Sequence, residues 1–189
     1  DFLAGDYRAL PARLLVAEYR GYGPCTGSPS VDTFLPDAHR TLDEARALLD
    51  AEEHTGPLVV MGRSLGSAPA IELASNRPDQ VSALIVESGF ARIVPLLELV
   101  GVPARRAGIT EDWGPRNLEK MKSVRRPTLI MHAEEDQIIP FEDARLLAGA
   151  CADPGIDFLG VPGAGHNDIQ PVAGRVYFER IATLLDRTG

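Results

Sequence analysis

Cysteine is scarce in this chain: its 189 residues include only Cys25 and Cys151. Two cysteines cannot build the disulfide framework of a small secreted domain, and neither stands in the C-x-x-C or Cys/His spacing of a metal site. We interpret both as reduced structural thiols, which favours a cytoplasmic location.

Long apolar runs and an excess of positive charge are also missing. No stretch approaches the roughly 18 consecutive apolar residues of a membrane-spanning helix. Basic residues number 19 against 27 acidic ones, which gives a formal net charge of −8. Because an acidic protein repels phosphate backbones, no nucleic-acid partner is expected. No secretory signal follows Asp1, yet a segment upstream of it could carry an anchor, so membrane contact stays open.

No internal repeat, low-complexity tract or linker interrupts the chain, which predicts one domain over residues 1–189. Strand-like apolar segments alternate with segments of helical periodicity. The expected strands are residues 14–17, 58–61, 81–86, 128–132 and 156–161. The expected helices are residues 2–10, 35–49, 67–76, 142–152 and 172–187, with Asp32 or Thr33 capping the second. This alternation predicts an α/β fold, a mostly parallel sheet with helices on both faces.

A sharp turn follows the strand expected at residues 58–61. It reads Gly62-Arg63-Ser64-Leu65-Gly66 and leads directly into a helix. This is the G-x-S-x-G pattern of a nucleophile elbow, in which glycines leave room for a strained serine. We expect the turn to lift the Ser64 hydroxyl above the sheet and to aim the Leu65 N–H at a substrate carbonyl oxygen.

A nucleophilic serine needs a base, and the chain offers His39, His54, His132 and His166. The first two lie on the polar side of a long helix or at its end, where solvated side chains are expected. We interpret His132, at a strand end, as structural. His166 lies in a glycine-rich loop after the last strand, from which an imidazole can reach over the sheet edge.

The base needs an orienting acid, and Asp136 is the carboxylate best placed on the loop beyond residues 128–132. We interpret Glu134 and Glu135 as solvated loop charges. Asp168 lies too close to His166 in sequence to reach its Nδ1 atom and is expected to shape the loop. The predicted triad is therefore Ser64, Asp136 and His166.

Four segments in chain order resemble motifs of the BEM46-like α/β-hydrolases, whose relatives include the ABHD13-type and ABHD17-type serine hydrolases. Residues 18–29 are similar to the family's D-Y-R-G-Y-G-x-S-x-G-x-P segment, and residues 62–67 to its G-R-S-L-G-G/S elbow. Residues 132–140 resemble the H-G-x-x-D-x-x-V-P acid loop, and residues 163–168 read G-A-G-H-N-D as in the family. Cys25 and Ala133 depart from the pattern, where the family has Ser and Gly.

The resemblance implies an α/β-hydrolase fold and hydrolysis of a small-molecule carboxylic ester or thioester through an acyl-serine. It also implies that no metal and no organic cofactor takes part. The family's H-G-N oxyanion strand would precede residues 2–10, so we expect an N-terminally truncated fold that lacks one oxyanion donor. Alternatively, the strand at residues 14–17 pairs directly with the elbow strand and closes the gap.

Residues 90–124 occupy the place of a short cap over the site. Their apolar side chains, Leu96, Leu97, Leu99, Val100 and Val102, would either line an acyl pocket or pack the cap on the domain. Two other functions fit the same motifs: a serine peptidase of the prolyl-oligopeptidase type, and a catalytically incomplete binding module. Amide substrates and covalent labelling of Ser64 discriminate between them.

Overall fold

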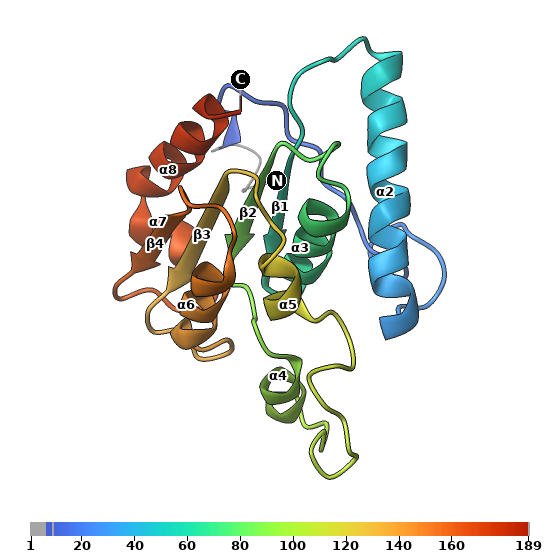
Figure 1. The fold of residues 1–189 in the computed structure, drawn as a ribbon, viewed down its shortest axis with the longest axis vertical. Coiled ribbons are helices and arrows are strands. Elements are labelled where there is room, and N and C mark those ends of the chain that lie inside the picture. Colours follow the sequence, from blue (N-terminus) through green and yellow to red (C-terminus); the bar gives the residue numbers. More distant parts are fainter. Residues whose placement is uncertain (1–6, 9, 189) are drawn as a thin grey trace.

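The described residues form a sheet of four parallel strands. A computed structural model describes residues 7, 8 and 10–188, and Figure 1 shows their arrangement. The strands follow the spatial order β1-β2-β3-β4. Their bounds are Val59–Arg63 for β1, Ala83–Glu87 for β2, Thr128–Ala133 for β3 and Asp157–Val161 for β4. All three strand pairings are parallel, so the carboxyl ends of the strands lie along one edge.

Helices connect the strands and cover the sheet. Their bounds are Val31–Ala51 for α2, Ser67–Asn76 for α3, Ile93–Leu99 for α4, Asn117–Met121 for α5, Phe141–Ala150 for α6, Ile169–Ala173 for α7 and Arg175–Asp186 for α8. A single 3₁₀ turn, η1 (Ser64–Gly66), joins β1 to α3. None of the helices in the described part of the chain combines the length and the apolar character needed to cross a bilayer.

Alternate residues of the central strands belong to two different cores. Leu84, Val86 and Ile130 pack in one cluster with residues of α2, α3, α5 and α6. Their neighbours Ile85 and Met131 pack in a second cluster with residues of α7 and α8. Since successive side chains of a strand point to opposite faces, both faces of the sheet are covered. The predicted α/β fold with a parallel sheet is confirmed.

Two predicted helices differ from the observed ones. The expected helix at residues 172–187 is two helices, because the chain turns at Gly174, whose φ of 54° is in the left-handed region that favours glycine. The long helix α2 begins earlier than expected, since Ser30 is its N-cap and accepts a hydrogen bond from the Thr33 N–H at 3.3 Å.

The strand predicted at residues 14–17 is wrong. These residues form no strand, and Leu14 and Val16 are 53% and 73% exposed. A strand requires a hydrogen-bonded neighbour, and β2 is the only strand that pairs with β1 among the described residues. Direct pairing of residues 14–17 with β1 is therefore wrong as well. The helix predicted at residues 2–10 lies largely outside the described residues.

The loop before α2 is attached to that helix by its own side chains. Arg20 donates two hydrogen bonds to the carboxylate of Asp37, at 2.7 and 2.6 Å. The ring of Tyr19 lies 5.2 Å from the ring of Phe34, centroid to centroid. The hydroxyl of Tyr19 also approaches Gly66, so this side chain extends from the loop to the turn after β1.

Residues 90–124 are anchored to the domain at their root. The buried carboxylate of Asp143 in α6 accepts hydrogen bonds from the backbone N–H groups of Ala91 and Arg92 and from the Arg92 guanidinium. Glu111 caps the start of α4 by accepting from the N–H groups of Ile93 and Val94, at 2.7 and 3.1 Å. Beyond this root, α4 and the loop after it extend past the end of the sheet (Figure 1).

Asp143→Ala should lower the free energy of unfolding by about 3 kcal/mol, because it leaves a guanidinium and a buried N–H without their acceptor. Denaturant unfolding followed by circular dichroism measures this change. Glu142→Ala is the matched control, since within the described part of the chain its exposed carboxylate reaches only Arg145, at 4.0 Å. The control should change stability by less than about 0.5 kcal/mol. Equal effects of the two substitutions would contradict the anchoring role of Asp143.

Candidate active site

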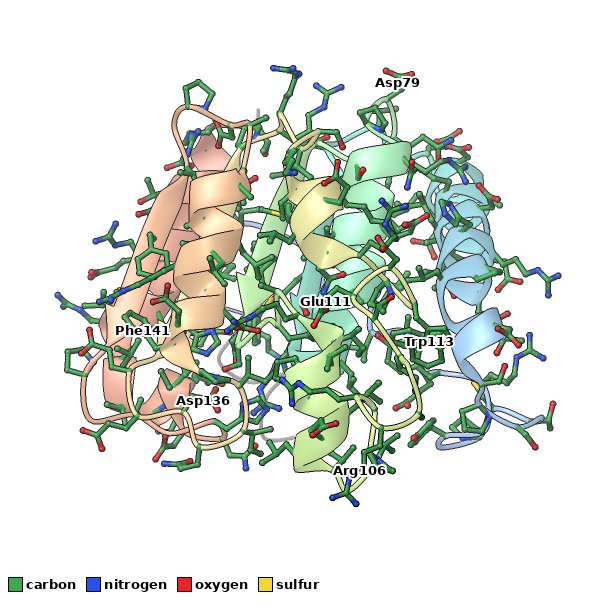
Figure 2. The ribbon with its side chains drawn as sticks, turned by 60° about the horizontal axis from the view of Figure 1, so that its bottom comes forward. Asp79, Arg106, Glu111, Trp113, Asp136 and Phe141 are labelled. Atoms are coloured by element: carbon green, nitrogen blue, oxygen red, sulfur yellow. The ribbon has the colours of Figure 1, made fainter. Side chains whose placement is uncertain are left out.

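The predicted site residues meet at the carboxyl edge of the sheet. Ser64 follows β1, Asp136 follows β3 and His166 follows β4. Figure 2 shows Asp136 at this end of the molecule and Asp79, which precedes β2, at the opposite end. In a parallel sheet this edge is where ligands bind, because the loops after the strands converge there.

The turn that carries Ser64 is strained and tightly packed. Ser64 has a φ of 52°, a left-handed conformation that is uncommon for residues other than glycine. A Cβ atom on Gly62 would lie 2.1 Å from the backbone oxygen of Gly66 and 2.7 Å from the Cβ of Ala70. Only glycine at position 62 lets α3 begin so close to β1, which is what the elbow pattern predicts.

Ser64 and Asp136 flank the two nitrogens of the His166 ring. The Ser64 Oγ atom lies 3.0 Å from His166 Nε2, and an oxygen of Asp136 lies 2.7 Å from His166 Nδ1. An ionised carboxylate only accepts hydrogen bonds, so Nδ1 carries the proton and Nε2 accepts from the serine hydroxyl. His166 is 6% exposed and the Asp136 side chain is fully buried, so water has little access to this hydrogen bond.

Asp136 is held as a carboxylate by its neighbours. Burial alone would raise its pKa. Hydrogen bonds donated by His166 and by the N–H groups of Ile139 and Ile138 outweigh burial and hold the pKa below its ordinary value. The two backbone bonds are both 2.8 Å long and go to Oδ1, which leaves Oδ2 for the imidazole. The loop therefore orients the carboxylate before any substrate is present.

The other histidines occupy different environments. His132 is fully buried as expected of a structural residue, and its Nε2 donates to the backbone oxygen of Ile139 at 2.9 Å. Burial lowers the pKa of His132, which keeps this ring neutral beside Asp136. His39 is not the solvated side chain we expected, because it is half-buried and its Nε2 lies 2.9 Å from a carboxylate oxygen of Glu72.

The loop that carries His166 is shaped as predicted. Asp168 accepts a hydrogen bond from the N–H of Gly165 at 2.6 Å, which closes the turn around the histidine. Sequence reasoning missed Arg63, whose guanidinium contacts this same loop, and Glu87, which binds Arg63. The available signal was Glu87 itself, a carboxylate at the carboxyl end of a strand that is otherwise apolar and buried.

A small apolar cluster borders the site. Ala68, four residues after Ser64, is buried together with Phe90 and Ile139. Four partly buried side chains pack on these three: Phe34, Leu35, Ile93 and Leu96. Leu96 thus joins the cluster, whereas Leu99, Val100 and Val102 on the outer part of the same segment are exposed. Over residues 7, 8 and 10–188, no three His, Cys, Asp or Glu side chains stand together as metal ligands would.

Comparison with known proteins gives homologues along nearly the whole chain, although no family model matches it. The protein bem46 of Schizosaccharomyces pombe is 34% identical over 187 residues, which are 95% of this chain and 59% of bem46. An uncharacterised protein of Mycobacterium tuberculosis is 33% identical over 98% of this chain and 64% of its own length. Alpha/beta hydrolase domain-containing protein 17B of Xenopus laevis is 31% identical over 96% of this chain and 59% of its own length. The chain therefore spans less than two thirds of these curated relatives.

Solved structures share the fold at low sequence identity. An esterase of Pyrococcus furiosus superposes with a TM-score of 0.73 at 16% identity, over 90% of this chain and 69% of the esterase. A monoacylglycerol lipase of Paleococcus ferrophilus superposes with a TM-score of 0.66 at 17% identity, over 91% of this chain and 82% of the lipase. The chain is thus an α/β-hydrolase-fold protein and a homologue of bem46 and of α/β-hydrolase domain-containing protein 17B.

Proposed function

We propose that this protein is a serine hydrolase that cleaves a carboxylic ester or thioester through an acyl-serine intermediate. The observation that carries the proposal is the unbroken line of hydrogen bonds from Ser64 through His166 to Asp136. Esterases and lipases among the structures of the same fold support this reaction class.

The first half of the reaction forms the acyl-enzyme. As the Ser64 Oγ attacks the acyl carbonyl, His166 Nε2 takes the hydroxyl proton, and the buried Asp136 carboxylate stabilises the imidazolium. The tetrahedral intermediate then collapses, the bond to the leaving alcohol or thiol breaks, and the imidazolium gives its proton to that group.

The second half releases the acid. Water attacks the acyl-serine while His166 Nε2 takes one of its protons, and the collapse of the second intermediate returns that proton to Ser64 Oγ. The Leu65 N–H, at the start of the helical turn after the serine, is the oxyanion donor that the chain supplies. The products are a carboxylic acid and the free enzyme, so water is the only co-substrate that the reaction consumes.

The apolar cluster beside Ser64 suits the acyl part of a substrate. Its half-buried members, such as Phe34 and Leu96, pack on a cluster that includes Ala68, four residues after Ser64, and leave part of their hydrocarbon exposed. Each methylene that moves from water onto such a surface gains about 0.8 kcal/mol, or about a fourfold change in binding. We therefore expect acyl esters of increasing chain length to bind with decreasing KM.

Ser64→Ala should abolish covalent labelling by a fluorophosphonate and lower ester turnover by about 10⁴-fold or more, because the nucleophile is lost. Intact mass spectrometry after incubation with the probe measures the labelling. Ser67→Ala is the matched control at the start of α3, since Ser67 is buried and its hydroxyl has no hydrogen-bond partner in the described structure. Labelling of the Ser64→Ala protein would remove Ser64 from the mechanism.

The same labelling experiment separates the alternative functions. A peptidase would label at Ser64 but hydrolyse amides as well as the matched esters. A binding module with an incomplete site would remain unlabelled although circular dichroism shows it folded. Hydrolysis of esters with little cleavage of matched amides is the outcome expected here.

Asp136→Asn should lower turnover by about 10⁴-fold, because an amide cannot hold the His166 tautomer that accepts the serine proton. It should also lower the free energy of unfolding at neutral pH by about 1–3 kcal/mol, since the carboxylate accepts three hydrogen bonds. The folded-state pKa is depressed, so this contribution is fully present above the ordinary value of 3.8 and is lost as the pH falls through the folded pKa. Denaturant unfolding of both proteins between pH 7 and the acid range measures the difference, and a difference that grew with acid would contradict the assignment.

Leu96→Ser should weaken the dependence of KM on acyl chain length, because it removes hydrocarbon from the cluster beside Ser64. Leu99→Ser is the matched control, since Leu99 lies on the same helix but is 55% exposed. Steady-state kinetics on esters from acetate to decanoate measure both slopes. If the two variants keep the slope of the unaltered protein, the acyl chain does not bind at this cluster.

A further inference from the structure

The side chain of Arg63 joins the serine turn to the histidine loop. Arg63 is the last residue of β1 and directly precedes Ser64. Its Nη2 atom donates to the backbone oxygen of His166 at 2.6 Å and to Oδ1 of Asn167 at 2.9 Å. A terminal guanidinium nitrogen carries two hydrogens, so a single atom serves both acceptors. Arg63, which is next to Ser64 in the chain, thus connects the serine turn to the His166 loop independently of the Ser64–His166 hydrogen bond.

Arg63 is itself fixed by a buried carboxylate. Its Nε donates to Oε1 of Glu87 at 3.0 Å, and the Glu87 side chain is only 8% exposed. The second oxygen of Glu87 accepts from the hydroxyl of Tyr177 in α8 at 2.5 Å. Burial and the charge of Glu87 raise the pKa of Tyr177 far above its ordinary value, so this hydroxyl remains a donor. Both carboxylate oxygens therefore accept hydrogen bonds, which fixes the orientation of the Glu87 carboxylate relative to Arg63.

We propose that Arg63 is a positioning residue that sets the distance between His166 Nε2 and Ser64 Oγ. This inference rests on the proposed function, because it concerns the same serine and histidine. Arg63 touches the backbone of the histidine, not its ring, so it acts through the loop. The hydrogen bond to Asp136 fixes the rotation of the imidazole about its side-chain torsions. Arg63 fixes the position of the His166 backbone, from which the imidazole side chain extends.

The contacts indicate a role beyond stability. The Arg63 side chain is 43% exposed but its partner Glu87 is buried, so removing Arg63 leaves a buried carboxylate unpaired and lowers the free energy of unfolding. The bond to the His166 oxygen joins positions 103 residues apart in the chain and lies within the site itself. A displacement of about 1 Å at a reacting pair can cost about 10²-fold in rate. Loss of Arg63 should therefore lower turnover by more than the accompanying loss of stability explains.

The test compares Arg63→Met and Arg63→Lys with Arg180→Met as the matched control. Arg180 has a similarly exposed side chain, at 42%, and is ion-paired with Asp157 at the opposite end of β4. For each protein, kcat and KM on a short-chain ester, the second-order rate of fluorophosphonate labelling and the melting temperature are measured. Intact Ser64 in all variants makes the labelling rate a direct report on the serine–histidine pair.

Arg63→Met should lower kcat and the labelling rate by about 10–100-fold and change KM by less than about twofold. Arg63→Lys should recover part of the labelling rate, because an ammonium can still donate to the His166 oxygen. Arg180→Met should label at the rate of the unaltered protein. Glu87→Gln is a second variant, which keeps the shape of the side chain but removes the negative charge that binds Arg63. It should lower the labelling rate, as Arg63→Met does.

The possible failures are distinguishable. If the unaltered, folded protein is not labelled, the proposed function fails and the inference about Arg63 fails with it. If the unaltered protein is labelled and Arg63→Met is labelled equally fast, only the positioning role is overturned. A loss of rate in Arg63→Met that Arg180→Met reproduces at the same melting temperature would also overturn it, because the loss would then follow from general destabilisation.

Discussion

The close approach of α3 to β1 is the constraint on which the site depends. The chain must leave the sheet and start a helix within three residues, and this is possible only because Gly62 has no side chain to collide with Gly66 and Ala70. The cost is a left-handed backbone at Ser64, a conformation that surrounding packing must enforce. That packing comes from α3, whose first eight residues, 67–74, are all buried. The strain that exposes the hydroxyl is therefore maintained by the core beneath it.

Each described strand ends in one part of the site. β1 leads to Arg63 and Ser64, β2 ends at Glu87, β3 is followed by Asp136 and β4 by His166. Because the four strands are hydrogen-bonded in parallel register, their ends are spaced by the sheet and not by the flexibility of the loops. The side-chain bonds then act over short distances on groups that the backbone has already brought near. This explains how His166 forms well-placed hydrogen bonds with two partners that are 30 and 102 positions away from it in the sequence.

The sequence predicted the features that are local in the chain. The elbow around Ser64 needs only its own glycines, and the central strands are recognisable because burial on both faces makes them continuously apolar. Features that depend on contacts between distant parts of the chain could not be predicted from the sequence. The apolar residues 14–17 favour an extended conformation, but no sequence pattern states whether a neighbouring strand is there to pair with them. Arg63 belongs to the elbow motif, but the motif does not predict what its side chain contacts, since its partners Glu87 and His166 lie far along the chain. The sequence around Gly174 is compatible with one long terminal helix. In the structure the positive φ of this glycine separates α7 from α8.

The serine turn leaves the described sheet from an edge strand. Among the described strands, β1 and β4 each have a hydrogen-bonded neighbour on one side only, and Met61 in the middle of β1 is 36% exposed. The amide hydrogens of β1 that point away from β2 have no carbonyl acceptor in the described sheet, so deuterium should replace them without any opening of the fold. Those of β2 and β3 are enclosed between strands and should exchange only through larger openings. The described sheet thus combines slowly exchanging central strands with a fast-exchanging edge strand that leads directly into the serine turn.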